Sequence, residues 1–227
     1  MRATAFALLI CVFFPFAANS AGVSGNSVLI SRDGYLITAE HVIAGCASMN
    51  AVSIGPVIAV GHDKANDLAL LKSNAKITTE PLPLSIAPVR PGDEVIAAGY
   101  PYQGVVGDLN VTNGIVYDLP SNRIEFTAPA VQLGNSGGAL LDRSGTLIGI
   151  LSAGRILGSG VFGTLTGILL SMHILGGGVF AVRSDVIQTF LSAQSVRPVL
   201  ADGKLERSRE EIAELARKSV FAIECLN

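Results

Sequence analysis

Three residues of this chain have the types that hydrolytic chemistry uses. His41, Asp67 and Ser136 occur in this order, each at the edge of an expected strand. A serine hydroxyl becomes a useful nucleophile when a base takes its proton, and histidine suits that task near neutral pH. A buried carboxylate keeps the histidine in one tautomer and stabilises the imidazolium that forms. We therefore expect His41, Asp67 and Ser136 to form a catalytic triad.

The glycines around Ser136 predict an oxyanion hole. The tetrahedral intermediate of acyl transfer carries a negative oxygen, which needs preorganised backbone N–H donors. Glycine allows the strained turn that points such donors inward, and the spacing assigns the task to Gly134 and Ser136. The run also fits the Gly-x-Ser-x-Gly turn of lipases and esterases. That fold has the order Ser, acid, His, with a helix after the serine, whereas here the serine comes last and a strand–turn–strand pattern follows.

The elements that must position these residues are mostly short apolar runs between turn signals. Such runs, joined by turns rather than by helices, predict an all-β fold of antiparallel barrels or a sandwich. Two helices are also expected, over 185–193 after Ser184 and over 209–218 after Ser208, with a linker at 196–204. The strands are expected at 27–30, 35–38, 51–60, 68–72, 93–99, 114–117, 123–127, 139–141, 146–152 and 178–182.

Three motifs resemble the signatures of trypsin-like serine peptidases. They are Thr-Ala-x-His at 38–41, Asp-Leu-Ala-Leu-Leu-Lys at 67–72 and Gly-Asn-Ser-Gly-Gly at 134–138. Asn135 before the serine is similar to the bacterial HtrA-like branch and implies a site that forms without zymogen cleavage. The resemblance covers about residues 25–192.

The resemblance implies two six-stranded barrels, and we expect the family's PDZ domains to be absent because no chain remains for them. We expect a protease domain over 21–193, with barrel one at about 21–84, barrel two at about 92–183 and a helix at 184–193. The residues 194–227 would supply a linker, a helix and a last strand.

The start of the protease region departs from the family pattern. The family's first strand precedes a Gly-Ser-Gly-Phe-like run, which 25–28 replaces here, and no such strand lies upstream. The segment 212–225 resembles the missing helix and strand, so we hypothesise a circular permutation in which 219–226 completes barrel one. Cys225 would then lie near Cys46 and could form a disulfide with it. The alternatives are an ordinary C-terminal helix and tail with two separate thiols, or a truncated second copy.

The resemblance also places the substrate pocket. Its floor would lie near Ala130, with Ser152, Ala153 and Gly154 as one wall. Because no acid lies at the floor, we expect a small or medium apolar P1 residue rather than a basic one. The segment 155–177 would border the cleft as a long loop. A membrane contact is an alternative that rests on the uncharged stretch 156–182, and the seven glycines of this stretch, His173 and the flanking strands disfavour it.

The ends and the charge of the chain bear on location and partners. Residues 1–20 have a basic start, an apolar run and small residues before Ala21, as in a cleaved signal peptide, so we expect a secreted or periplasmic protein. The net charge of -2 and the lack of a basic run argue against nucleic acid as a partner. His62 and Asp63 are expected in a turn, and neither metal nor other cofactor is predicted.

Two other classes of function remain open at this point. One is a catalytically silent binding module that keeps the protease fold, with its cleft blocked by 155–177. The other is a membrane-associated structural protein, which rests on the apolar segment 156–182. The leading prediction is an endopeptidase that acts on protein or peptide substrates; the oligomeric state is not predicted.

Overall fold

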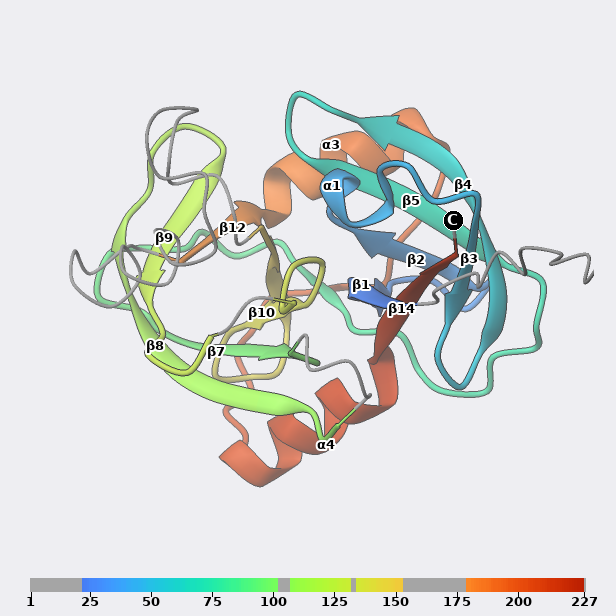
Figure 1. Cartoon of the computed structure of the whole chain (residues 1–227). Helices are drawn as coiled ribbons and strands as arrows, with labels where there is room; N and C mark the ends of the chain where they lie inside the picture. Colours follow the sequence, from blue (N-terminus) through green and yellow to red (C-terminus); the bar gives the residue numbers. More distant parts are fainter. Residues whose placement is uncertain (1–21, 102–106, 132–133, 153–178, 227) are drawn as a thin grey trace, which may run out of the picture.

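The computed structural model describes residues 22–101, 107–131, 134–152 and 179–226. The chain forms two six-stranded antiparallel β-barrels with a few short helices, which is the chymotrypsin-like fold. The barrels lie side by side in Figure 1, barrel one in blue and cyan with one red strand, and barrel two in green, yellow and orange. The predicted signal peptide and the segment 155–177 lie outside the described residues.

Barrel one combines strands from both ends of the chain. Its ring has the order β1-β14-β3-β4-β5-β2, and β2 pairs with β1 to close it. The strands are β1 (Gly22–Leu29), β2 (Tyr35–Thr38), β3 (Ser48–Ala51), β4 (Gly55–Asp63), β5 (Leu68–Ser73) and β14 (Val220–Leu226).

The strand β14 lies between β1 and β3, antiparallel to both. Val28 pairs with Val220 on one side, and Ile223 pairs with Ala51 on the other. Figure 1 shows the red β14 running beside the blue β1. The expectation that 219–226 completes barrel one is therefore confirmed as far as the strand's position is concerned; the permutation relative to the family stays a hypothesis.

Barrel two is built from strands that follow one another in the chain. Its ring has the order β10-β7-β8-β9-β12-β11, closed by pairing of β10 with β11. Two short strands, β6 (Leu84–Ser85) and β13 (Leu200–Ala201), continue the sheet through parallel pairings beside β11. The ring strands are β7 (Glu94–Gly99), β8 (Asn110–Asp118), β9 (Arg123–Thr127), β10 (Ala139–Leu141), β11 (Leu147–Leu151) and β12 (Val179–Arg183).

Three apolar clusters hold the barrels and join them. One fills barrel one and includes Leu36, while another fills barrel two and includes Phe126. The third contains Ile37 and Ile150, so it packs one barrel against the other together with apolar residues of the helices. Successive residues of a strand point to opposite faces, which is why β2 buries Leu36 inside its barrel and Ile37 in the junction. Residues at the barrel junction are therefore held from both sides.

Three helices are described. The four-residue α1 (Glu40–Ile43) follows β2, α3 (Ser184–Ala193) follows β12, and α4 (Arg209–Ser219) leads directly into β14. Ser208 caps α4 in a capping box with Glu211, as its sequence predicts. Ser184 is the first residue of α3 rather than its cap, because Arg183 takes the cap position.

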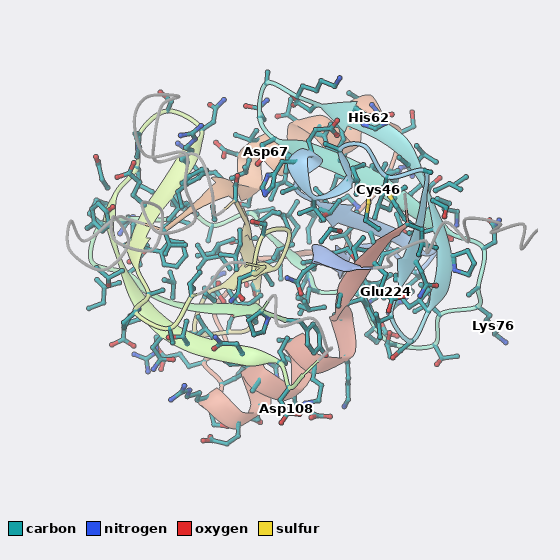
Figure 2. All side chains as sticks on the ribbon, viewed as in Figure 1. Cys46, His62, Asp67, Lys76, Asp108 and Glu224 are labelled. Atoms are coloured by element: carbon teal, nitrogen blue, oxygen red, sulfur yellow. A yellow bond between two sulfur atoms is a disulfide. The ribbon has the colours of Figure 1, made fainter. Side chains whose placement is uncertain are left out.

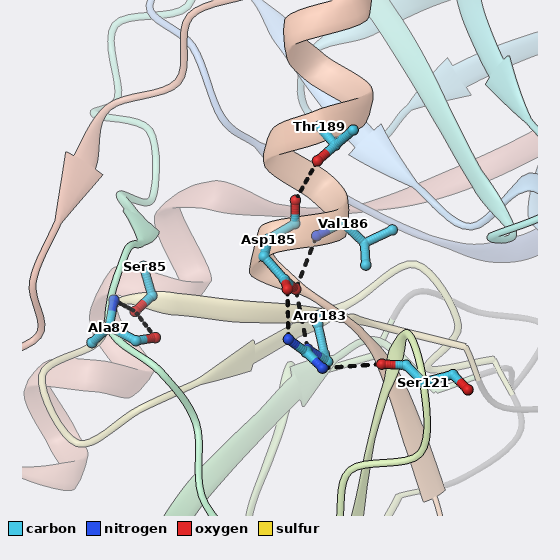
Figure 3. Close-up of polar contacts among 7 residues, drawn as sticks. All are labelled: Ser85, Ala87, Ser121, Arg183, Asp185, Val186 and Thr189. Atoms are coloured by element: carbon cyan, nitrogen blue, oxygen red, sulfur yellow. Dashed lines mark hydrogen bonds and ion pairs between the residues drawn. The ribbon is translucent and has the colours of Figure 1, made fainter.

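The junction of β12 and α3 is fixed by charge. The Arg183 guanidinium donates to both carboxylate oxygens of Asp185 at 3.1 and 2.5 Å, and to the Ser121 carbonyl at 3.0 Å (Figure 3). Asp185 Oδ1 in turn accepts the Val186 N–H at 3.0 Å. The contacts tie the first turn of α3 to the loop between β8 and β9.

The single strand expected at 51–60 is wrong. It consists of the end of β3, a turn and the start of β4, and Met49 pairs with Val57 across this hairpin. His62 and Asp63, expected in a turn, are the last residues of β4. In the described part of the chain, no helix is long and apolar enough to cross a membrane.

Candidate active site

His41 and Asp67 form a hydrogen-bonded pair in barrel one. His41 lies in α1, after β2, and Asp67 lies directly before β5, the neighbour of β2. The His41 Nδ1 is 2.8 Å from the Asp67 Oδ2, and the His41 backbone N–H donates to Oδ1 at 3.0 Å. Because Nδ1 faces a carboxylate, Nδ1 carries the proton and Nε2 keeps its lone pair. The pair thus leaves Nε2 as a base.

The backbone of Asp67 is bent to reach α1. Asp67 has a φ of 56°, in the left-handed region that non-glycine residues seldom occupy. Its carbonyl accepts the Glu40 N–H at 3.2 Å, so both the main chain and the side chain of Asp67 bind α1. A residue held in this region costs on the order of 1–3 kcal/mol and is typical of functional sites.

The carboxylate of Asp67 is kept ionised by its partners. Burial alone would raise its pKa, but hydrogen bonds from His41 and Ser152 outweigh burial, so the pKa lies below its usual value. The side chain of Asp67 is 17% exposed, whereas that of His41 is 42% exposed. The acid is therefore shielded while the imidazole is open to a substrate. Figure 2 shows Asp67 where the two barrels meet.

Ser136 lies in barrel two, in the turn before β10, and is 5% exposed. Gly134 and Gly137, on either side of it, have φ values of 96° and 78°, which a glycine adopts without strain. A side chain at Gly137 would meet the Asn26 carbonyl at 2.0 Å. The glycines are therefore required by the shape of the turn and by its contact with barrel one.

Two sets of contacts bring Ser136 to the His41–Asp67 pair. The Gly137 N–H donates to the Leu151 carbonyl at 2.7 Å, and the next residue, Ser152, donates its hydroxyl to Asp67 Oδ2. On the other side, Gly25 lies between the Ser136 carbonyl and the side chain of Val42, the neighbour of His41. The two are so close to Gly25 that a Cβ added there would meet both, the Ser136 carbonyl at 2.8 Å. The three residues expected from the sequence thus lie around one point of the barrel junction.

The proposed oxyanion donors lie in the same turn. The Asn135 carbonyl accepts the Gly138 N–H at 3.0 Å. In a trans peptide the N–H points opposite to the carbonyl, so this bond directs the Ser136 N–H away from Gly138. The side chain of Asn135 is fully buried, and neither of its amide atoms has a hydrogen-bond partner among the described residues.

The predicted pocket residues are only partly described. Ala130 is exposed, and its carbonyl accepts the Asn110 side-chain amide at 2.6 Å. Ser152 is 1% exposed and binds Asp67, while Ala153 and Gly154 lie outside the described residues. A hollow of about 670 Å³ beside the His41–Asp67 pair is lined by His41, Asp67 and Ser152, together with Glu40, Ile43, Ala44, Gly45, His62 and Lys64.

His62 pairs with the carboxylate of Glu40. Its Nδ1 is 2.9 Å from Glu40 Oε2, so the two side chains form one edge of the hollow. Within the described ranges, no group of three or more His, Cys, Asp and Glu side chains could hold a metal. The role of Ser152 as a donor to Asp67 was not predicted; its place at the end of the β11 run was the one signal for it.

Cys46 and Cys225 form a disulfide, with 5.2 Å between their Cα atoms. The bond joins β14 to the loop that follows α1, a few residues from His41, and so links the last strand of the chain covalently to the rest of barrel one. Figure 2 shows it in yellow beside Cys46. The implied pairing is confirmed.

Comparison with known proteins gives the class to which this fold and site belong. The family described as "Trypsin-like peptidase domain" matches residues 24–150. The chain belongs to this family. It is 33% identical over 147 residues to "Protease Do-like 1, chloroplastic" of Arabidopsis thaliana, covering 57% of this chain and 33% of that protein. It is 31% identical over 144 residues to "Serine endoprotease DegS" of Haemophilus influenzae, covering 58% of this chain and 42% of that protein.

Two further matches cover more of the chain. An "Uncharacterized protein y4bJ" of Sinorhizobium fredii is 29% identical over 224 residues, which is 91% of this chain and 33% of that protein. A solved serine endoprotease from Yersinia pestis superposes with a TM-score of 0.58 at 29% identity, covering 74% of this chain and 56% of that one. The chain therefore spans a third to about two fifths of the curated relatives' length.

Proposed function

We propose that this protein is a serine endopeptidase whose triad is His41, Asp67 and Ser136. The observation that carries the proposal is the contact between His41 Nδ1 and Asp67 Oδ2 at 2.8 Å, beside the turn that bears Ser136. Such a pair alone does not identify a catalytic site, because His62 and Glu40 form a similar one at 2.9 Å. The His41–Asp67 pair differs because Ser152 binds Asp67, and its neighbour Leu151 binds the turn that bears Ser136. Membership of the trypsin-like family and similarity to proteins named as endoproteases support the same function.

The proposed reaction has two stages. Ser136 Oγ attacks the substrate carbonyl carbon while His41 Nε2 takes its proton, and the Gly134 and Ser136 N–H groups receive the oxyanion. His41 then gives the proton to the leaving amine as the C–N bond breaks, which leaves an acyl group on Ser136. Water attacks this ester, His41 accepts the water proton and returns it to Ser136, and the acid is released. Asp67 stays ionised throughout and stabilises the imidazolium.

The substrate preference belongs to the same proposal. We expect cleavage after small or medium apolar residues, because no acid is expected at the pocket floor near Ala130. A peptide panel that varies the P1 residue tests this, and strong cleavage after Arg or Lys would contradict it.

Labelling with a fluorophosphonate probe tests the nucleophile. The wild type should form a covalent adduct that peptide mapping assigns to Ser136, and Ser136→Ala should not be labelled. Ser27→Ala, a buried serine of β1 whose hydroxyl binds the Phe221 carbonyl, is a matched control and should label normally. A folded wild type that never labels would favour the silent binding module instead.

We also propose that the protein is exported and is secreted or periplasmic. The apolar N-terminal segment and the Cys46–Cys225 disulfide support this, because disulfides persist in oxidising compartments. Cell fractionation with N-terminal sequencing should find a chain that begins at Ala21 outside the cytoplasm. A cytoplasmic chain that begins at Met1 would contradict the proposal.

A further inference from the structure

The side chain of Asn26 connects three separate segments at the barrel junction. Asn26 lies on β1, where it pairs with Ala222 of β14, and it is fully buried. Its Nδ2 donates to the Gly134 carbonyl at 2.7 Å and to the Tyr100 carbonyl at 3.2 Å, while its Oδ1 accepts the Tyr100 N–H at 2.7 Å. One amide therefore holds both the chain after β7 and the turn of the nucleophile.

The main chain of Asn26 binds the same turn. Its N–H donates to the Ser136 carbonyl at 2.8 Å, and Nδ2 lies 3.4 Å from that oxygen. Its carbonyl accepts the Thr38 hydroxyl at 2.5 Å, which fixes Asn26 to the end of β2. The side-chain amide and the main chain of one residue thus bind the two peptides that flank the Asn135–Ser136 peptide.

These contacts determine the direction of an oxyanion donor. Three consecutive carbonyls of the turn are occupied: Gly134 by Asn26 Nδ2, Asn135 by the Gly138 N–H, and Ser136 by the Asn26 N–H. Because each peptide is planar, fixing the flanking peptides fixes the one between them, whose N–H belongs to Ser136. That N–H is the donor assigned to the oxyanion hole.

The turn 134–138 depends on hydrogen bonds from outside itself to fix its conformation. Three of its five residues are glycines, which restrain the backbone least. The buried amide of Asn135 makes no hydrogen bond to the described part of the chain, so none of these residues holds the turn through it. The backbone at Gly99 and Gly137 approaches Asn26 so closely that an added Cβ would lie 3.2 Å from its Nδ2 and 2.0 Å from its carbonyl, respectively.

We propose that Asn26 is a positioning residue for the oxyanion hole, acting from barrel one on the turn that barrel two presents. The inference rests on the proposed peptidase function, because it concerns the same site. Asn26 touches no reacting atom, and its effect passes through the peptide that carries the Ser136 N–H.

Asn26→Asp is the sharpest variant, because it keeps the shape of the side chain and replaces the donor to Gly134 with an oxygen. The carboxylate would face the Gly134 and Ser136 carbonyls, which repel it. Removing one oxyanion donor outright lowers kcat about 10²–10³-fold. We expect a decrease in kcat of about 10- to 100-fold for Asn26→Asp, with KM changed less than about threefold. Asn26→Ala, which adds no charge, should lower kcat in the same direction.

Ser219→Ala is the matched control. Ser219 is 2% exposed, and its hydroxyl donates to the Glu80 carbonyl at 2.9 Å, away from the nucleophile turn. The control loses a partly buried side-chain hydrogen bond at the end of α4, directly before β14, so it should lose stability while keeping the wild-type kcat. All chains are assayed at a temperature at which circular dichroism shows them folded.

Hydrogen exchange of the peptide that contains 134–138 provides a readout without catalysis. It should be faster in Asn26→Asp and Asn26→Ala than in the wild type and in Ser219→Ala. If kcat and exchange in both Asn26 variants equal those of Ser219→Ala, the inference is overturned. If the wild type itself shows neither cleavage nor labelling, the proposed function fails. The exchange comparison, repeated in a Ser136→Ala background, then decides alone whether Asn26 orders the turn.

Discussion

The two barrels differ in how they are closed. Barrel two closes by pairing β10 with β11, which are neighbours in the chain, whereas barrel one closes only when β14 inserts between β1 and β3. Barrel one also carries the disulfide, which bridges a sequence separation of 179 residues. Barrel one therefore needs contacts between residues far apart in the chain, and it is the barrel that presents His41 and Asp67.

The two barrels also contribute different residues to the candidate site at their junction. Barrel one supplies the proposed base His41, its partner Asp67 and the Asn26 amide, while barrel two supplies the Ser136 turn and the Ser152 hydroxyl. Neither barrel alone contains a complete site. Changes in barrel one should therefore affect catalysis and closure together, and the following predictions test this from the largest expected effect to the smallest.

Asp67→Asn should have a larger effect than the disulfide, capping and pH changes described after it. An amide at this position favours the wrong histidine tautomer and cannot stabilise the imidazolium, which in a triad lowers kcat by about 10⁴-fold. Steady-state kinetics on a peptide substrate measures the loss. Asp33→Asn, at an exposed turn of the same barrel, is the control and should keep the wild-type rate. Equal rates in the two variants would contradict a catalytic role for Asp67.

The disulfide tests the closure of barrel one. Loss of a native disulfide costs about 2–5 kcal/mol, and the chain-entropy estimate for so long a loop is about 5 kcal/mol. Cys46→Ser combined with Cys225→Ser should lower the free energy of unfolding by this amount. Hydrogen exchange should increase first in β14, β1 and β3, with β7 to β12 still protected. Equal loss of protection in the two barrels would contradict the comparison.

The cap of α4 tests the approach to β14. Ser208 accepts the Glu211 N–H at 3.2 Å, and its own N–H donates to the Glu211 carboxylate at 2.8 Å. Ser208→Ala should cost about 1 kcal/mol of stability in urea unfolding. Ser192→Ala, an exposed serine of α3, should change stability by less than about 0.5 kcal/mol. Equal effects would show that capping α4 does not support barrel one.

The lowered pKa of Asp67 predicts a gradual pH effect. In the folded state this pKa lies below that of the unfolded chain, about 3.9, so the unfolded state binds more protons as the pH falls. The stabilisation from Asp67 is full above about pH 3.9 and is lost as the pH falls through the lowered folded-state pKa. The difference in unfolding free energy between the wild type and Asp67→Asn should therefore narrow from about pH 6 to about pH 3. A constant difference would contradict this.

Much of the fold and site follows from sequence because the signals are local. Asp-Gly and Pro-Gly turns separate the expected strands, and the order of His41, Asp67 and Ser136 selects one hydrolase class. The hairpin between β3 and β4 was missed because its turn includes Ser53 in the left-handed region, at φ 71°, where glycine or asparagine is the usual signal. The four-residue α1 is too short for a periodic pattern.

The contacts that sequence could not predict depend on tertiary structure. Asn26 lies within an ordinary strand pattern, and its role becomes visible only when β1, Tyr100 and the Ser136 turn meet. Ser152 likewise acquires its partner Asp67 from the other barrel. The position of β14 was predicted from a family resemblance, because no local pattern tells a strand where in a barrel it inserts.

The central claim is that residues from the two barrels act as one catalytic unit. A double-mutant cycle of His41→Ala and Ser136→Ala, measured as kcat/KM on one peptide substrate, tests it most directly. The effects of replacing triad residues are strongly non-additive, and losing the serine or the histidine costs about 10⁶-fold. The account predicts that each single variant loses activity on this scale and that the double variant is no worse than either. Losses that multiply, or a single variant that keeps wild-type activity, would contradict it.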